Sequence, residues 1–346
     1  MGRFEKREGE VPAMRAGVDS GGEHSRKAQS KNASIIIPVY NRTDDLLKLL
    51  AQLKVQNRND FELVVVDDGS CPPVSESLIV SNYPFPVLLI RHHDQRGIAA
   101  ARNTGIASSS GELVVFIDSD ACVADPDWYE KHMRLYRRAE DMARKKNKTS
   151  YVFHSEVYGI SESYIGRVDT YANWLGSCMK KACLIRDRHV PMNNTSMHRS
   201  VFSAVGMFDE EFRISEDIEW GFRCLSHGVA LIYVPGAPVG HYDRNTVGGV
   251  WDHYYRFGQY TPKVRARHPD APRSWLYPKN IFQAVILFLP LTFLKTIYIL
   301  MQWIPQSPWV FLYTPGIYLA NVASFWGMCK TLRAIGCRKR QKHISR

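Results

Sequence analysis

The chain has 346 residues, 45% of them hydrophobic, which excludes a disordered or fibrous protein and allows one large domain or two small ones. Its formal net charge is +11, but nine Lys and Arg and no Asp or Glu lie from Lys279 onward, so the preceding part carries only +2. Because long apolar runs share this basic segment, the charge indicates a membrane surface, and no nucleic-acid partner is expected. The seven cysteines form no CxxC pair, which indicates a reduced, cytosol-facing compartment.

The first part of the chain predicts a sheet of parallel strands joined by helices. Residues 1–32 mix charges with Gly and Ser without apolar periodicity, which is typical of a disordered leader. Four apolar segments follow, at 34–40, 61–66, 86–90 and 113–117. Helical segments at this spacing predict βαβ units with right-handed crossovers, hence an α/β fold. No GxGxxG follows the first strand, which disfavours the dinucleotide-binding version of that fold.

Polar residues stand at the carboxyl ends of these predicted strands, where open α/β sheets bind their ligands. Tyr40 and Asn41 end the first strand, Asp68 ends the second, and Asp118 and Asp120 end the fourth. Two carboxylates at the end of a buried strand are costly unless a cation compensates them, and a hard cation with phosphate co-ligands would do so. Taken alone, the Asp-Ser-Asp sequence fits a turn that caps the next element equally well. Three polar strand ends at one edge favour the metal site.

The region after the fourth strand mixes helices and strands. Residues 128–148 predict an amphipathic helix whose basic end is a solvated face. Within the mixed region 151–240, Glu216-Asp217 precedes a second amphipathic pattern. A like-charged neighbour can raise the pKa of a carboxyl, which suits Asp217 as a general base for an acceptor hydroxyl. The alternative is the ordinary acidic charge of a helix's first turn.

Two apolar stretches close the chain, at 281–303 and 309–328. Each is long enough to cross a hydrocarbon core of about 30 Å as a helix, so residues 279–330 predict a pair of membrane-associated helices followed by a basic tail, 331–346. Both outer flanks are basic, which places them and the preceding domain on the cytoplasmic side of a spanning hairpin at the cytoplasmic membrane. The alternative is a pair of kinked helices in the interface, where Lys295 extends its ammonium group to water.

Five motifs occur in the order and spacing of a known family: Ile-Ile-Ile-Pro-Val-Tyr-Asn, Val-Val-Val-Asp-Asp-Gly-Ser, Gly-Ile-Ala-Ala-Ala-Arg-Asn-Thr-Gly, Phe-Ile-Asp-Ser-Asp and Ser-Glu-Asp. The chain thereby resembles family 2 glycosyltransferases over about residues 33–245. The resemblance implies a GT-A domain over 33–270, a mostly parallel nucleotide-sugar-binding sheet with flanking helices, and sugar transfer with inversion. The apolar tail adds a resemblance to membrane-attached members that build polysaccharides or glycolipids.

The resemblance implies a role for each matching residue. Asp68 corresponds to the carboxylate that accepts a hydrogen bond from the nucleobase, usually uracil, which favours a UDP-sugar. Asp120 is expected to hold Mn²⁺ or Mg²⁺, Asp118 to contact the ribose or metal-bound water, and Asp217 to act as catalytic base. His241 matches a late histidine on the metal or diphosphate, with a structural histidine as the equal alternative.

Other residues are weaker matches to the family pattern. The further donor contacts implied are Pro38, Tyr40, Asn41 and Arg102. For Arg102, packing is an equal alternative to a contact with nucleotide or diphosphate. The candidate acceptor contacts are Asn194, Glu216 and Trp220.

The sequence therefore predicts a divalent-metal-dependent, inverting glycosyltransferase acting on a hydroxyl of a glycan or lipid-linked acceptor. Processive relatives carry Gln-x-x-Arg-Trp after the base, and the nearest stretch, 254–260, does not match, so one sugar per encounter is predicted. One alternative is a nucleotidyltransferase, which would have a Gly-rich and basic loop after the first strand. Another is a non-catalytic membrane scaffold, which would not need the acidic residues.

Overall fold

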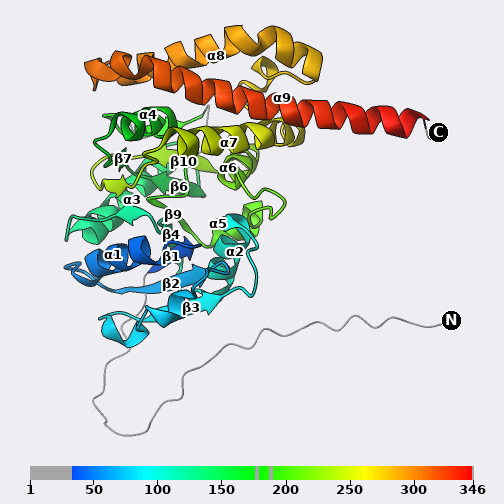
Figure 1. The fold of residues 1–346 in the computed structure, drawn as a ribbon. Coiled ribbons are helices and arrows are strands. Elements are labelled where there is room, and N and C mark those ends of the chain that lie inside the picture. Colours follow the sequence, from blue (N-terminus) through cyan, green and yellow to red (C-terminus); the bar gives the residue numbers. More distant parts are fainter. Residues whose placement is uncertain (1–32, 176–178, 187–189, 345–346) are drawn as a thin grey trace, which may run out of the picture. The chain divides into compact units, whose positions relative to one another are not determined.

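The computed structural model describes residues 33–175, 179–186 and 190–344, so the predicted leader lies outside the described residues. Within them the main sheet has eight strands in the order β3-β2-β1-β4-β9-β6-β10-β8 (Figure 1). The strands of this sheet are β1 (Ala33–Val39), β2 (Phe61–Asp67), β3 (Val87–Arg91), β4 (Leu113–Phe116), β6 (Tyr151–His154), β8 (Cys183–Ile185), β9 (Thr195–His198) and β10 (Ala230–Tyr233). The first four pair in parallel, as predicted, whereas β9 pairs antiparallel with β4 and β6. The predicted α/β class is confirmed.

Helices cover both faces of the sheet and bury the strands between them. The helices of these two layers are α1 (Thr43–Lys54), α2 (Ile98–Ser108), α3 (Trp128–Arg144), α5 (Ser200–Val205) and α6 (Glu216–Ser226). Successive side chains of β1 point to opposite faces, so Ile35 and Ile37 pack with α1 and α3 while Ile36 packs with α2, α5 and α6. Burial on both faces explains why the strand sequences are continuously apolar, and each such side chain contributes about 1.5–3 kcal/mol.

A second, smaller sheet carries one end of the site. It consists of β5 (Ala121–Cys122), β11 (Val239–His241) and β7 (Val157–Gly159), with β11 in the middle. The antiparallel pairing of β11 with β5 sets His241 opposite Ala121. The residue before Ala121 is Asp120, so this pairing brings together two predicted site residues that lie far apart in the sequence.

Helices from the second half of the chain form a further layer (Figure 1). They are α4 (Tyr164–Asn173), α7 (Val247–Arg267), α8 (Ile281–Trp303) and α9 (Thr314–Ile344), and the 3-10 helix η5 (Pro308–Tyr313) joins the last two. Figure 1 shows α9 between α7 and α8. The hydroxyl of Thr331 donates to the carbonyl of Gln259 on α7 (3.0 Å), and the amide of Asn321 donates to the hydroxyl of Thr296 on α8 (2.9 Å). These bonds tie α9 to both neighbours.

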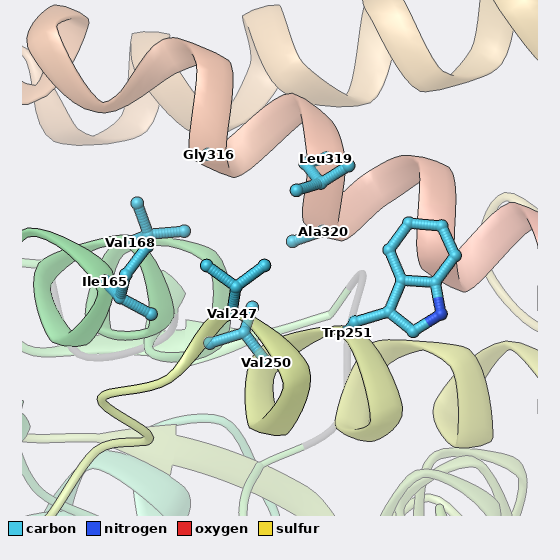
Figure 2. Close-up of a pocket in the computed structure, with 8 residues that line it drawn as sticks. All are labelled: Ile165, Val168, Val247, Val250, Trp251, Gly316, Leu319 and Ala320. Carbon is cyan, nitrogen blue, oxygen red and sulfur yellow. The ribbon is translucent and has the colours of Figure 1, made fainter.

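Apolar side chains fill the junction of α4, α7 and α9. Figure 2 shows Val168, Val250 and Leu319 among the residues that surround a crevice of about 20 Å³ there. This volume holds about one water molecule, and an apolar lining gives water no partners. The crevice is therefore a packing feature of the helical layer and not a ligand site.

Among the described helices, α8 is the one that is long and apolar enough to cross a membrane. The second predicted apolar stretch, 309–328, is divided between η5 and the first half of α9, which continues into a basic segment. Only 22% of the apolar window in α8 is buried, so this helix presents apolar surface to its surroundings.

Gly258 of α7 and Gly327 of α9 let these two helices approach closely. A Cβ at Gly258 would lie 1.7 Å from the carbonyl oxygen of Ser324, and one at Gly327 would lie 2.0 Å from that of Tyr255. We expect Gly327→Ala to force the helices apart and to destabilise the chain by about 1–3 kcal/mol, measured as a lower melting temperature in neutral detergent. Gly336→Ala, on the same helix with nothing within 4 Å of its Cβ, is the control. Equal melting temperatures for the two variants would contradict the expectation.

Candidate active site

The carboxyl ends of β1, β2 and β4 open into a cavity of about 1320 Å³. The predicted site residues that line it are Pro38, Tyr40, Asp68, Arg102, Asp118, Asp120, Glu216, Asp217 and His241. They come from strand ends, two helix starts and the small sheet. The volume exceeds the roughly 300–1,000 Å³ of an ordinary small-molecule pocket, so two substrates can be accommodated together.

Asp68 is held in place by the loop that follows β3. The backbone N–H groups of Arg96 and Gly97 donate to its two oxygens at 3.0 and 2.8 Å. The Nδ1 of His92 lies 2.7 Å from its Oδ1, and the Nε2 of the same ring contacts the hydroxyl of Thr104. A carboxylate has about four lone-pair positions, so Asp68 keeps acceptor capacity for a ligand in the cavity.

Asp118, Asp120 and His241 form a cluster that could hold a metal ion. One ligand atom from each residue lies within 4.8 Å of the other two. The Nε2 of His241 is 3.3 Å from Oδ1 of Asp120, and its Nδ1 is 3.3 Å from Oδ1 of Asp243. The indole N–H of Trp174 donates to the same Asp243 oxygen (3.1 Å), which fixes the carboxylate that orients the imidazole. Two carboxylates and one imidazole suit a divalent cation such as Mn²⁺.

The two carboxylates of this cluster differ in their electrostatic surroundings. Burial raises the pKa of Asp118, although Arg102 opposes this. Burial alone would also raise the pKa of Asp120, but His241 and Arg42 lower it below the usual value. Burial disfavours the imidazolium, yet Asp120 and Asp243 raise the pKa of His241 to about 10. The positive charges of His241 and Arg42 thus lie close to Asp120.

Arg102 lies buried between two carboxylates. Its Nη2 is 3.0 Å from Oδ1 of Asp118, and its Nη1 pairs with Glu216. The rings of Phe116 and Phe208 flank the guanidinium, with centroids 5.9 and 5.8 Å from its Cζ. The geometry supports the packing alternative, in which Arg102 positions Asp118 and joins the end of β4 to α6. Glu216 lines the cavity, but its carboxylate is engaged by this arginine.

Asp217 lies in the first turn of α6, as predicted. Ser215 before it has a left-handed backbone (φ 66°), which turns the chain sharply into the helix. The backbone N–H of Ile218 donates to Oδ1 of Asp217 at 2.8 Å. Burial raises the pKa of Asp217 to about 6, against the opposing charge of Arg102. A carboxylate with this pKa can accept a proton near neutral pH.

Two of the predicted acceptor contacts are wrong, because the side chains are buried outside the cavity. Asn194 is 0% exposed, and its amide donates to the carbonyls of Glu156 (2.7 Å) and Ala237 (2.8 Å). Trp220 is 0% exposed, and its indole N–H donates to the carbonyl of Gly206 (2.9 Å). Both side chains hold the domain together and offer no surface to an acceptor.

Asn41 likewise does not line the cavity. Its backbone N–H donates to the hydroxyl of Ser70 (2.9 Å), and its side-chain oxygen accepts from the backbone N–H of Cys71 (2.8 Å). Asn41, with φ at 51°, thus connects the loops that follow β1 and β2, and its predicted donor contact stays a prediction.

The structure adds residues that the sequence interpretation missed. The Nη1 of Arg42 is 3.2 Å from Oδ2 of Asp120, and Arg244 lines the cavity while pairing with Asp169 (3.1 Å). Arg42 directly follows the polar end of β1, and Asp243 follows His241 by two residues, so both could have been found as neighbours of predicted site residues. Arg244 had no such signal, because its partner Asp169 lies on α4.

The fold and site together define an α/β domain with a candidate metal-binding active site, and comparison with known proteins identifies the family. Residues 113–326 match the family model described as glycosyl transferase family group 2, and residues 34–169 match glycosyl transferase family 2. The first match covers more than half of the chain, so the chain belongs to this family of glycosyltransferases.

Known relatives are similar at moderate identity. The pre-mycofactocin glycosyltransferase of Mycobacterium tuberculosis is 27% identical over 261 residues, which are 74% of this chain and 52% of that protein. The chain therefore spans about half the length of that relative. Glycosyltransferase AglE of Haloferax volcanii is 27% identical over 65% of this chain and 71% of its own length. The solved structure of mannosyltransferase PcManGT from Pyrobaculum calidifontis, in complex with GDP-Man and Mn²⁺, has a TM-score of 0.52 at 17% identity, covering 89% and 86% of the two chains. This likeness shows the fold.

Proposed function

We propose that the chain transfers a sugar from a nucleotide-diphosphate-sugar to a hydroxyl of a glycan or lipid-linked acceptor, with inversion and with the help of a divalent cation. The observation that carries this proposal is the presence of two different acidic sites in one cavity. Asp118, Asp120 and His241 could hold a metal ion, and Asp217 is a separate carboxylate with a raised pKa. A metal-assisted, inverting transfer from a sugar diphosphate uses both, the cation for the leaving group and the carboxylate for the acceptor proton.

Asp217 is proposed to supply the proton acceptor in the reaction. The acceptor oxygen forms a bond to the anomeric carbon from the face opposite the leaving group, the bond between that carbon and the diphosphate oxygen breaks, and the hydroxyl proton passes to Asp217. Attack from the opposite face inverts the anomeric carbon. A bound divalent cation would neutralise the charge that develops on the nucleoside diphosphate. Arg42 and Arg244 line the cavity as further positive charges for this group.

Asp68 supports a uracil base in the donor. Its remaining acceptor capacity can take up the ring N–H of a pyrimidine base, and Pro38 and Tyr40 border the same part of the cavity. We therefore propose a UDP-sugar. The loop after β1 is not Gly-rich, which disfavours a nucleotidyltransferase, and the unmatched stretch 254–260 supports the transfer of one sugar per encounter.

We place the α8–α9 pair in the interface of the cytoplasmic membrane, with the catalytic cavity on the cytoplasmic side. Large apolar side chains of α8, such as Phe282, Leu289 and Phe293, are exposed. On its other side α9 is tied to α7, which carries the ion pair Arg256–Asp252 (2.9 Å). If the hairpin crossed the bilayer, these charges would be drawn toward hydrocarbon at a cost of several kcal/mol. An interfacial position leaves α7 in water, and the basic flanks attract an anionic leaflet.

A screen of nucleotide-sugars tests the proposed function. The full chain in neutral detergent, with Mn²⁺, is expected to release UDP from a UDP-sugar in the presence of a membrane lipid extract. Asp68→Ala is expected to raise the donor KM about tenfold, since a hydrogen bond to a charged group is lost. Release of pyrophosphate from a nucleoside triphosphate and a sugar phosphate would instead support the nucleotidyltransferase, and failure to bind any nucleotide would support the scaffold.

A further inference from the structure

The charge of the lining of the large cavity differs between the end with the carboxylates and the end formed by the C-terminal helices. The part contributed by α7, by the following loop and by α8 and α9 has one carboxylate among its described lining residues, that of Asp252. Its cationic lining residues are Arg256, Arg265, Arg273 and Lys295. Beyond Lys279 the sequence itself has no Asp or Glu, so no carboxylate of α8 or α9 can balance the charge of Lys295. One end of the cavity is therefore mainly acidic, and the other combines an excess of positive charge with apolar helices.

Three of these cations already have partners. Arg256 pairs with Asp252 at 2.9 Å. Arg265 donates to the carbonyl of Pro272 (2.7 Å) and lies over the ring of Tyr277, 4.3 Å from its centroid. Arg273 lies 5.2 Å from the centroid of another aromatic ring, that of Tyr298. Their positions are accounted for by the packing of α7, the loop and α8.

Lys295 has no such partner. It is the only charged residue of α8, and among the described residues no ion pair involves it. It lines the cavity together with Leu291 and Tyr298, which lie four residues before and three residues after it and so share one face of the helix. Lys295 is exposed to this cavity, so its ammonium group can be met by water or by an anion. This lysine faces the space in which a substrate would lie.

The opposite face of α8 is apolar and exposed. It carries Phe282, Val285, Ile286, Leu289 and Phe293, each more than half exposed. One helix thus offers a cation to the cavity and a hydrocarbon-like surface to the outside. A molecule that satisfies both must have an anionic head group joined to an apolar chain.

We propose that the acceptor is a lipid with an anionic phosphate group between its hydrocarbon chain and its reactive hydroxyl, and that Lys295 binds this phosphate. The inference rests on the proposed function and specifies its acceptor class. The phosphate is a binding handle and not the nucleophile: an oxyanion needs no base, whereas the hydroxyl gives its proton to Asp217 as it forms the bond to the anomeric carbon and the nucleoside diphosphate leaves. The chain of the lipid lies along α8 and α9, in the membrane interface.

Dodecyl phosphate is a simple probe for this site. With the full chain in neutral detergent, calorimetric titration is expected to show binding of dodecyl phosphate that is at least tenfold tighter than that of inorganic phosphate, which lacks the chain, or of dodecyl maltoside, which lacks the charge. Lys295→Gln is expected to weaken the binding about tenfold, and Lys295→Arg to retain it, since a charged contact is lost in the first and kept in the second. Lys279→Gln is the matched control, because Lys279 is exposed at the start of α8 and does not line the cavity.

Hydrolysis of the UDP-sugar donor distinguishes a failure of the lipid-site inference from a failure of the proposed function. Lys295→Gln should hydrolyse the UDP-sugar slowly in the presence of Mn²⁺ at the wild-type rate, since that reaction uses no lipid. Equal binding of dodecyl phosphate by Lys295→Gln and Lys279→Gln, or equal binding of dodecyl phosphate and dodecyl maltoside by the wild type, would overturn the lipid site. Inorganic phosphate binding as tightly as dodecyl phosphate would indicate a soluble phosphorylated acceptor and would overturn it as well. Loss of donor hydrolysis in the wild type would instead count against the glycosyltransferase while leaving lipid binding to be judged by these titrations.

Discussion

Asp217→Asn is expected to lower kcat by about 10²–10⁴-fold while leaving the KM for the donor within about threefold, because positioned general bases contribute rate factors of that size. An amide has nearly the shape of the carboxylate and can still accept from the backbone N–H of Ile218, so the start of α6 should keep its conformation. The measurement is a steady-state assay of nucleoside diphosphate release with saturating acceptor. Asp270→Asn, at an exposed carboxylate outside the cavity, is the control and should behave as the wild type.

The pH dependence of kcat gives an independent check on the role of Asp217. Burial raises its pKa to about 6, so the carboxyl is protonated and inactive below that pH. We expect kcat to fall about tenfold for each unit of pH below about 6 and to be level above it. In Asp217→Asn this ionisation is absent, so the remaining activity should lack that limb. A wild-type profile that is flat between pH 5 and 8, or an Asn variant that keeps both the rate and the acidic limb, would exclude Asp217 as the base.

Much of the site could be predicted from the sequence because parallel strands end at a common edge. Once four apolar segments were interpreted as parallel strands, the positions of Asp68, Asp118 and Asp120 at one side of the sheet followed from the topology alone. The start of α6 at Glu216 was similarly visible, since acidic residues precede an amphipathic pattern. These features depend on local sequence and on the general rules of βαβ folds.

The remaining features depend on contacts between distant parts of the chain. Arg102 and Glu216 are 114 residues apart, and nothing near either residue shows that they pair. Trp220 lies only three residues after Asp217, yet its large ring packs with Phe202 and Phe208 in the core. Asn194 is in a polar Asn-Asn-Thr-Ser stretch that could equally belong to a surface loop. Whether a polar residue faces a ligand or satisfies backbone groups in the interior is decided by tertiary packing, which local pattern does not contain.

The helical layer gives a further example of this limit. Composition correctly indicated an apolar α8, but the close approach of α7 and α9 depends on Gly258 and Gly327, whose role appears only when the two helices are side by side. That contact is one ground for our proposal of an interfacial α8–α9 pair in place of the spanning hairpin that the apolar lengths suggested. It also forms the wall of the cavity on which Lys295 lies.

Asp120→Ala is expected to abolish metal-dependent transfer, with kcat/KM for the donor reduced by about 10³-fold or more, because the charge that stabilises the leaving diphosphate is lost together with the cation. Removing the metal from the wild type with EDTA should have the same effect, and adding Mn²⁺ should restore activity in the wild type but not in Asp120→Ala.

Calorimetric titration with Mn²⁺ measures binding to this cluster directly. The His241→Gln variant should bind Mn²⁺ about 10–100-fold more weakly, whereas His227→Gln, at an exposed histidine, should bind it as the wild type does. Because Arg42 and His241 pair with Asp120, the Ala variant leaves these positive charges without that partner, so its melting temperature must be measured alongside. A folded Asp120→Ala protein that binds Mn²⁺ with wild-type affinity and retains full activity would exclude the cluster as the metal site.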